Sequence, residues 1–381
     1  MHTKADHLDI EENVLTISDG EDYFQNQTSE LGSPVSIQKT TVGELNHQDP
    51  IFDSLKQEYD GFIEWLDGIP DRDAWVNWNA DGTLGAVLIL KYNEIEEIGV
   101  DPPLDAKIRL KISTLKVAEC KWGSKAGELL VSLAIREAIK NGLEEIYLTH
   151  HIDGTEDYLT DLISDYGFRQ ASVTEEGEQV FIKRLIPGPG DTPDPNETMK
   201  RFYPSFHDGD EIDKYLIPIQ PQWHNKLFPT YSKRQPTLDE VAGQFVPESN
   251  AIKKAYLTHA NIRSIEQTDI LLFYRSHDEK ELTSIGICES AKYEITETKK
   301  IKDIVGKRSV FSESEIEKMA KKPTTVLLFN WYFDLSDPIR YQDLRDEEII
   351  AGAPQTIQQL NEDSYNSIKK LGDIDERFTI N

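Results

Sequence analysis

The segment at 186–198, IPGPGDTPDPNET, divides the chain and most constrains how it can fold. It holds four prolines and two glycines, which interrupt both helices and strands. The chain of 381 residues is also too long for one ordinary domain, since domains commonly have roughly 100–200 residues. We therefore predict two domains, at 35–185 and 206–381, joined by a linker at 186–205.

Charge is distributed unevenly along the chain. It carries 41 basic and 69 acidic residues, for a net charge of −28. Residues 1–200 hold 17 basic and 39 acidic residues, whereas 201–381 hold 24 and 30. A surface this acidic is unsuited as a whole to binding nucleic acid or anionic membranes. Within 1–34 a single lysine stands among eight acids, so we expect a disordered acidic leader there.

The composition further limits the class of protein. No apolar run reaches the roughly 18–20 residues that a membrane span needs, and the N-terminus lacks the pattern of a secretory signal. Cys120 and Cys288 are the only cysteines, which fits a reducing compartment better than a disulfide scaffold. We expect a cytoplasmic protein without membrane contact, and no His or Cys spacing indicates a metal site.

Hydrophobic periodicity in the first domain alternates between strand and helix. Apolar side chains share one helical face at 49–68 and at 126–140, and a third helix is predicted at 156–166. Strands are predicted at 35–42, 74–78, 83–92, 106–119, 144–150, 167–174 and 178–184. This order predicts a mixed β-sheet with helices packed against it.

The stretch 113–138, STLKVAECKWGSKAGELLVSLAIREA, runs from a strand through a loop of small residues into the clearest helix. Backbone N–H groups at the start of a helix can bind anions, and small side chains let a phosphate approach them. Together with the order of strands around it, this stretch resembles the acyl-coenzyme A element of the GNAT superfamily of N-acyltransferases. The resemblance covers about 35–185 and implies acetyl-coenzyme A as acyl donor.

The same resemblance implies which residues would hold the donor. They are Leu115, Lys116 and Val117 for the pantetheine arm, and Lys121, Trp122, Gly123, Ser124, Lys125, Ala126 and Gly127 for the pyrophosphate loop. The usual pattern of the loop can start at Lys121 or at Trp122, and it is incomplete in both registers. The family's tyrosine four residues before a Gly-Phe pair is replaced by Ile163.

Transfer of an acyl group to an amine needs a base that accepts a proton. Candidates at the ends of the central strands are Glu119, His150 and His151, with Asp153 and Tyr158 close by in the sequence. A neutral imidazole is a base near pH 7, which favours the histidine pair. Adjacent histidines at a strand end are also common in turns, and Glu119 suits a solvated surface equally well.

The second half changes to short strands with few helices. Strands are predicted at 213–220, 251–258, 269–276, 282–295 and 324–335, with helices at 312–322 and near the C-terminus. This spacing predicts a small β-barrel with helical insertions. The stretches DILLFYRS (269–276), SIGICESAKYE (284–294) and GKRSVFSESEIEKM (306–319) resemble the PUA-like group that includes ASCH and EVE domains, over about 210–345.

That second resemblance implies recognition of RNA or of a modified nucleobase. A base pocket needs an aromatic platform, a cation and hydrogen-bond donors. The candidates are Tyr274, Arg275, Ser276, Lys307, Arg308, Ser309 and Trp331. The alternative is that the aromatic residues form barrel core and the basic residues lie in solvated turns.

These observations predict an α+β protein, with a GNAT-like mixed sheet and flanking helices followed by a small PUA-like β-barrel with a C-terminal helical extension. The predicted function is N-acetyl transfer from acetyl-coenzyme A, with recognition of RNA or a modified nucleobase by the second domain. The alternative is a non-catalytic RNA-binding or regulatory protein, of a toxin–antitoxin or phage-defence kind, on a degenerate acyltransferase scaffold. The altered loop and Ile163 favour the alternative, and the retained Gly, Ser and Lys residues oppose it.

Overall fold

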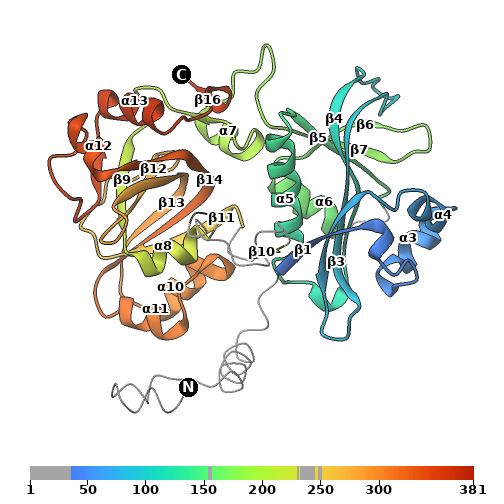
Figure 1. The fold of residues 1–381 in the computed structure, drawn as a ribbon, viewed down its shortest axis with the longest axis horizontal. Helices are drawn as coiled ribbons and strands as arrows, with labels where there is room; N and C mark the ends of the chain where they lie inside the picture. The colour runs from blue at the N-terminus through green and yellow to red at the C-terminus, as the bar shows by residue number, and fades with distance from the viewer. Residues whose placement is uncertain (1–35, 153–156, 230, 232–244, 248–250) are drawn as a thin grey trace, which may run out of the picture.

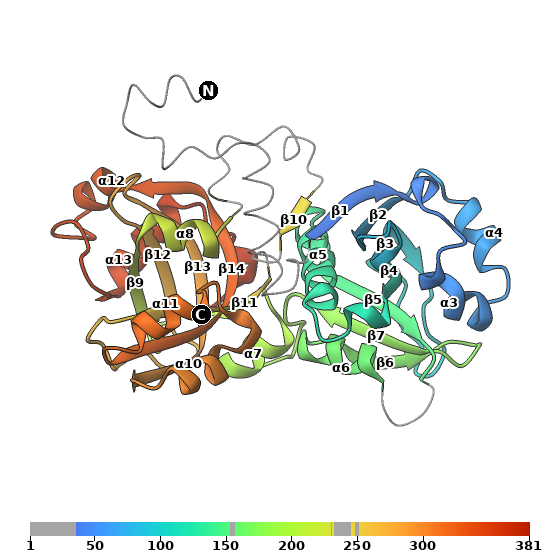
Figure 2. The same cartoon turned by 90° about the horizontal axis from the view of Figure 1, so that it is seen from below.

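The computed structural model describes residues 36–152, 157–229, 231, 245–247 and 251–381. The predicted leader at 1–34 lies outside these residues. The described chain forms two halves that lie side by side, each built on its own β-sheet (Figures 1 and 2). No helix in these ranges has both the length and the apolar character that crossing a bilayer requires.

The first sheet has eight strands in the order β10-β1-β2-β3-β4-β5-β7-β6. Their bounds are β1 Ser36–Thr41, β2 Asp73–Trp78, β3 Leu84–Glu96, β4 Lys107–Val117, β5 Glu145–His150, β6 Arg169–Val173, β7 Gln179–Arg184 and β10 Phe245–Pro247. Neighbouring strands are antiparallel except β4 and β5, which are parallel. Sequence analysis did not predict β10, which comes from the second half of the chain and pairs with β1.

Helices cover both faces of the first sheet. The helix α5 (Ala126–Lys140), which begins and ends where the sequence predicted, lies with α6 (Tyr158–Asp165) on the face toward the second half (Figure 1). The outer face carries α3 (Asp53–Glu58) and α4 (Phe62–Asp67) after short 3-10 turns η2 (Val42–Glu44) and η3 (Pro50–Phe52).

The single helix predicted at 49–68 is wrong. Gly61 adopts the left-handed conformation, with φ +80, and separates α3 from α4. Only glycine takes this conformation without strain, so the chain turns at that position and a continuous helix cannot form.

The second sheet has six strands in the order β11-β14-β13-β12-β9-β15. Their bounds are β9 Lys214–Ile219, β11 Lys253–Thr258, β12 Ile270–Arg275, β13 Glu281–Ile295, β14 Thr324–Arg340 and β15 Gln358–Leu360. Sequence analysis predicted a small β-barrel, but β11 and β15 are edge strands that do not pair with each other in the described chain, so closure of the sheet is not seen there.

The reason for the open sheet is visible in β12, which is buried on both faces. Leu272 packs into one core while Leu271 and Phe273 pack into another on the opposite side. Helices cover both sides instead of the sheet closing around one core (Figure 1). They are α8 Pro221–Leu227, α10 Thr298–Val305 and α11 Glu313–Met319 on one side, and α12 Tyr341–Asp346 and α13 Glu362–Leu371 on the other.

The chain is completed by short elements between and after these helices. They are η7 Gly306–Arg308, η8 Glu376–Phe378 and the parallel pair β8 Phe206–His207 and β16 Thr379–Ile380.

The segment predicted as the linker is folded and packed. It forms α7 (Pro195–Arg201), whose start is capped by Asp194 accepting a hydrogen bond from the N–H of Glu197 at 2.8 Å. Beyond the helix, the buried Tyr203 hydroxyl donates to the carbonyl of Trp331 in β14 at 2.8 Å. One apolar core runs from α5 through Tyr203 into the second sheet, so the two halves share buried surface.

Candidate active site

Strands β4 and β5 pair only at their beginnings and then separate. The register joins Leu110 to Ile146 and Lys111 to Tyr147, and β4 then continues to Val117 without pairing to β5. A cavity of about 1510 Å³ occupies the opening and is lined by 111–117 of β4 and 148–150 of β5. This volume exceeds the roughly 300–1,000 Å³ of a pocket for one small ligand.

The loop between β4 and α5 closes one end of the cavity. It passes through the 3-10 turn η4 (Glu119–Lys121) and reverses at Gly123, which has φ +77. The hydroxyl of Ser124 accepts from the N–H of Ala126 at 3.3 Å. The next two N–H groups of α5, on Gly127 and Glu128, have no acceptor among the described residues. These free donors and the positive end of the helix dipole favour an anion at this end.

Most of the residues that the GNAT resemblance implied for the donor lie around this cavity. Those that line it are Leu115, Lys116, Val117, Lys121, Trp122, Gly123, Ser124 and Gly127. Lys125 and Ala126 do not line it: Lys125 is the N-cap of α5, and Ala126 is buried in the core.

Two of the lining residues have roles that the sequence did not suggest. A methyl group on Gly127 would lie 2.8 Å from Cδ2 of Leu162, so its smallness lets α5 approach α6. The indole N–H of Trp122 donates to the carbonyl of Val117 at 3.3 Å, and its ring packs 5.3 Å from that of Tyr158.

The residues present suit a long ligand that carries amides and phosphates. Beyond Lys111 the edge of β4 toward β5 pairs with no described strand, and the loop offers N–H donors without a described acceptor, with lysines beside them. The side-chain oxygens of Ser113 and Thr114, which also line the cavity, are buried and have no hydrogen-bond partner within the described ranges. The residues placed by the structure contain no group of three or more His, Cys, Asp or Glu side chains that could hold a metal ion.

Of the three candidate bases, His150 has the most defined geometry. It lines the cavity, and its Nε2 lies 2.5 Å from Oδ2 of Asp157. Oδ1 of Asp157 caps α6 by accepting from the N–H of Thr160 at 2.9 Å. Burial raises the pKa of Asp157, but the contacts with Thr160 and His150 outweigh it, and the net pKa lies below the usual value.

Glu119 and His151 are placed differently. Glu119 lines the cavity from η4 with an exposed side chain. His151 is outside the lining, and its ring lies 6.0 Å from that of Tyr59. Of the other two residues considered, Asp153 lies outside the described residues, and Tyr158 is an exposed wall of the cavity. The structure thus brings His150 and Glu119 to one cavity and leaves His151 at its edge.

The sequence analysis missed the acidic wall next to the histidines. Tyr59 donates its hydroxyl hydrogen to Oε1 of Glu178 at 2.8 Å, and both line the cavity with Glu58 and Asp60. Tyr59 and Glu178 are 119 residues apart in the chain, so no local pattern could connect them. Asp157 was also missed, although an acid just before an apolar helix is a recognisable N-cap.

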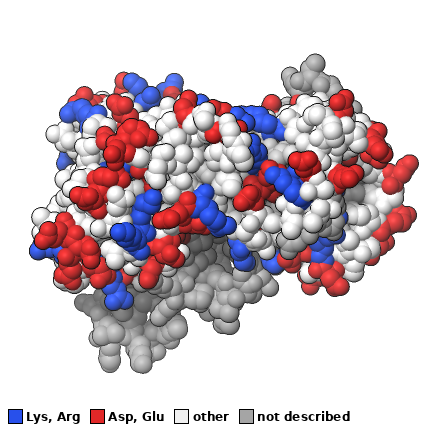
Figure 3. Space-filling model, turned by 90° about the horizontal axis from the view of Figure 1, so that it is seen from above, with Lys and Arg blue, Asp and Glu red and all other residues white. Residues whose placement is uncertain are grey.

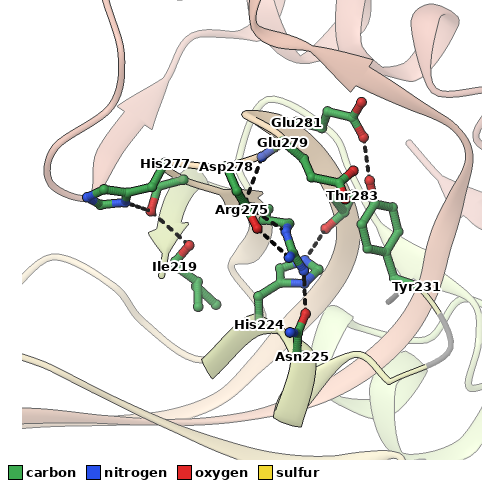
Figure 4. A network of polar contacts seen from close by, with 11 residues as sticks. Ile219, His224, Asn225, Tyr231, Arg275, His277, Asp278, Glu279, Glu281 and Thr283 are labelled. Atoms are coloured by element: carbon green, nitrogen blue, oxygen red, sulfur yellow. Dashed lines mark hydrogen bonds and ion pairs between the residues drawn. The ribbon is translucent and has the colours of Figure 1, made fainter. Parts of the chain in front are cut away.

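The seven residues predicted for nucleic-acid binding are not gathered on one surface. Tyr274 and Trp331 are buried in the cores. Arg275 is held by Asp278, with Nε 2.9 Å from Oδ1 (Figure 4). The buried Ser276 hydroxyl donates to the carbonyl of Ile219 at 2.9 Å. Lys307, Arg308 and Ser309 lie in and directly after η7.

A buried polar network surrounds Arg275 (Figure 4). His224 lies 3.5 Å from the guanidinium and has Nε2 2.7 Å from the hydroxyl oxygen of Thr283. Burial lowers the pKa of His224 to about 3, with Arg275 acting in the same direction. His224 is therefore neutral near pH 7 and is part of the packing of the second half.

The surface in Figure 3 shows acidic and basic side chains interspersed. That face offers no broad positive area of the kind a phosphate backbone binds. RNA or a modified nucleobase as a partner of the second half stays a prediction.

No known protein family matches the sequence, and no curated protein matches it. Solved structures match parts of the chain. One is the ASCH protein of Zymomonas mobilis, with 14% identity, coverage of 42% of this chain and 94% of that one, and a TM-score of 0.31. Another is a Bacillus subtilis acetyltransferase in complex with coenzyme A, with 19% identity, coverage of 40% and 99%, and a TM-score of 0.29.

A third is from the NatC complex bound to Gag peptide and coenzyme A, with 16% identity, coverage of 39% and 98%, and a TM-score of 0.28. Both kinds of domain that the sequence resembles are therefore among the matching structures. These scores and identities are too low to carry a conclusion about activity, donor or partner.

Proposed function

We propose that the protein is an N-acyltransferase that takes its acyl group from acetyl-coenzyme A. The observation that carries this proposal is the opening between β4 and β5, which ends at the free N–H groups of Gly127 and Glu128 at the start of α5. When bound, acetyl-coenzyme A would supply a thioester whose acyl group passes to an amine, with coenzyme A released as the thiol.

The chain's own residues would bind and orient this donor. The open edge of β4 at Leu115–Val117 would hydrogen-bond the amides of the pantetheine arm. Lys121 and the loop at Gly123 and Ser124 would face the pyrophosphate. Binding along an extended strand edge fixes the thioester near the ends of β4 and β5, where His150 lies.

His150 is the base in this proposal, and Asp157 is its positioning residue. Because Nε2 contacts the carboxylate, Nδ1 is the ring atom left for proton transfer. As the amine nitrogen bonds to the acyl carbon and the carbon–sulfur bond breaks, His150 takes the proton that the amine loses. A proton returned by His150 or by water then completes the leaving thiol.

The acceptor in this proposal is an amine that is cationic in solution and releases that first proton to water before its nitrogen attacks the acyl carbon. Glu58, Asp60 and Glu178 line the cavity beside Tyr59, whose ring contacts that of His151. An acidic wall attracts a protonated amine and concentrates it near the base. A carboxylate or phosphate acceptor would be repelled from the same wall.

Calorimetric titration of the full chain with acetyl-coenzyme A tests the donor site. We expect wild-type protein to bind, and the variant Ser124→Glu to bind at least about tenfold more weakly, because it places a negative charge where the pyrophosphate would lie. The matched control is Ser314→Glu, which makes the same change in the first turn of α11, away from the cavity.

Two results would contradict the proposal. If the wild-type protein does not bind acetyl-coenzyme A, the first half has no donor site, and the non-catalytic regulatory alternative is favoured. Binding without transfer to any amine, in a panel of polyamines, lysine peptides and aminoacyl-tRNA followed by mass spectrometry, would leave a coenzyme-binding protein that is not this enzyme.

A further inference from the structure

Lys307 belongs to the second half of the chain but lines the cavity of the first. It lies in η7, between α10 and α11, and faces the loop that precedes α5. A methyl group placed on Gly123 would lie 3.7 Å from its Nζ, and nothing else would lie within 4 Å of that methyl group. The amine therefore stands next to the backbone turn of the proposed pyrophosphate loop.

The backbone around Lys307 is anchored on both sides. Before it, α10 ends at the buried Val305, and Gly306 turns the chain with φ +49. After it, Arg308 forms an ion pair with Glu289 of β13 at 2.6 Å, and Ser309 pairs with Ala255 of β11. The second sheet thus holds the position from which the Lys307 side chain extends.

None of the described residues neutralises the charge of Lys307. Its ammonium group makes no hydrogen bond or ion pair with any residue for which the structure gives a position, and the same holds for Lys116 and Lys121. In a chain with a net charge of −28, three such cations line one cavity. Cations without a partner among the described residues favour a negatively charged ligand in the cavity that they line.

We propose that Lys307 binds the pyrophosphate of the acyl donor from the opposite side, so that both halves of the chain form the donor site. This inference rests on the function proposed above. Gly123 itself places no side chain between its backbone and Lys307, which would let a phosphate reach both. Donor binding would then also join the second half to the first.

Titration of the full chain with acetyl-coenzyme A, comparing wild type with Lys307→Gln and Lys307→Glu, tests the inference. We expect about tenfold weaker binding for Lys307→Gln and a larger loss for Lys307→Glu, as for removal and reversal of a charge-assisted contact. The matched control Lys300→Glu changes an exposed lysine of α10 outside the cavity, and its affinity should equal that of wild type. Added salt should reduce the difference between wild type and Lys307→Gln.

Two further ligands locate the contact on the donor. Dephospho-coenzyme A keeps the pyrophosphate, so Lys307→Gln should weaken its binding by the same factor. Acetyl-pantetheine lacks the pyrophosphate, so the variants should bind it as wild type does. A loss confined to ligands with the 3′-phosphate would overturn the pyrophosphate assignment.

The outcomes separate this inference from the proposed function. If wild type binds acetyl-coenzyme A and both Lys307 variants bind it equally well, the inference is wrong and the donor site stands. If wild type does not bind at all, the proposed function itself fails. Thermal unfolding without ligand checks that each variant is folded.

Discussion

The carboxylate of Asp157 connects the imidazole of His150 to the start of α6. Oδ2 lies 2.5 Å from Nε2 of His150, and Oδ1 accepts from the N–H of Thr160 at 2.9 Å. The helix start therefore determines the carboxylate's position, and the carboxylate in turn orients the ring at the end of β5. Asp157 thus both caps α6 and orients the candidate base His150.

Substitution of this pair separates catalysis from binding. His150→Gln should lower the rate of acyl transfer by roughly 10²–10⁴ and leave the affinity for acetyl-coenzyme A unchanged, because it removes a base and not a donor contact. Asp157→Asn should lower the rate less, since asparagine still caps α6 but does not stabilise a charged ring. The measurement is the transfer rate against pH, beside calorimetric affinity.

The control for this pair is Glu119→Gln. Its carboxylate also lines the cavity, but it makes no hydrogen bond or ion pair with a described residue that would orient it as a base. The assignment would be wrong if His150→Gln kept the wild-type transfer rate while Glu119→Gln lost the roughly 10²–10⁴ in rate predicted for His150→Gln. Glu119 would then be the base.

Gly167 is required by close packing against the segment that joins the halves. It has φ +85, and a methyl group on it would lie 2.6 Å from the carbonyl oxygen of Lys200 and 2.8 Å from that of Arg201. Backbone atoms cannot move aside cheaply, so Gly167→Ala should lower the free energy of unfolding by about 2–4 kcal/mol. Chemical denaturation measures this value.

Gly142→Ala is the matched control, because Gly142 also has positive φ, +68, but has nothing within 4 Å of such a methyl group. Gly142→Ala should lower the free energy of unfolding by only about 1 kcal/mol, because it introduces backbone strain without a steric clash. Equal losses for the two variants would show that contact with α7 does not contribute at Gly167.

The buried His224 should make the protein sensitive to acid. Its folded-state pKa of about 3 lies below the ordinary 6.5, so below pH 6.5 the unfolded chain binds a proton that the folded chain does not. Stability should therefore fall as pH drops from about 6.5 toward 3, by roughly 2–3 kcal/mol at pH 4.5 from this group.

Denaturation of wild type and His224→Gln at pH 7 and pH 4.5 isolates the contribution of this group. The variant has its own cost at pH 7, since it alters the contact with Thr283. Between pH 7 and pH 4.5, the free energy of unfolding of the variant should fall less than that of wild type, by roughly 2–3 kcal/mol. An equal pH dependence in both proteins would mean that His224 is not neutral when folded.

The two cysteines should differ in reactivity. Cys120 is exposed and lines the cavity, whereas Cys288 is buried and burial raises its pKa to about 12. One thiol should therefore react with a maleimide in the native protein and both after denaturation. Acetyl-coenzyme A should slow the native reaction, and Cys120→Ser should abolish it. An unchanged rate with saturating donor would place the donor away from Cys120.

Several features of the molecule could be predicted locally. The helix α5 was predicted with its correct bounds because its apolar residues repeat at helical spacing and Asn141-Gly142 ends it. Most strands of both sheets were located, because alternating and apolar runs depend only on neighbours in the chain, but β10 and β15 were not predicted. The loop at Gly123 was also identified from its composition, since small residues before a helix form a local pattern.

Other features depended on contacts between distant residues. The division of 49–68 into two helices followed from the conformation at Gly61, and the open second sheet followed from cores on both of its faces. Arg275 and Trp331 were predicted to face nucleic acid, yet they are buried, because the same residue types serve surfaces and cores.

The sequence by itself determined most of the secondary structure of the first half and the acidic character, because these depend on short-range periodicity and composition. Only the tertiary structure decided which side chains share the cavity. It placed Asp157 on His150, Glu178 on Tyr59, and Lys307 of the second half beside Gly123 of the first. Such pairs form where strands separate and where the two halves pack together, and no local sequence pattern predicts them.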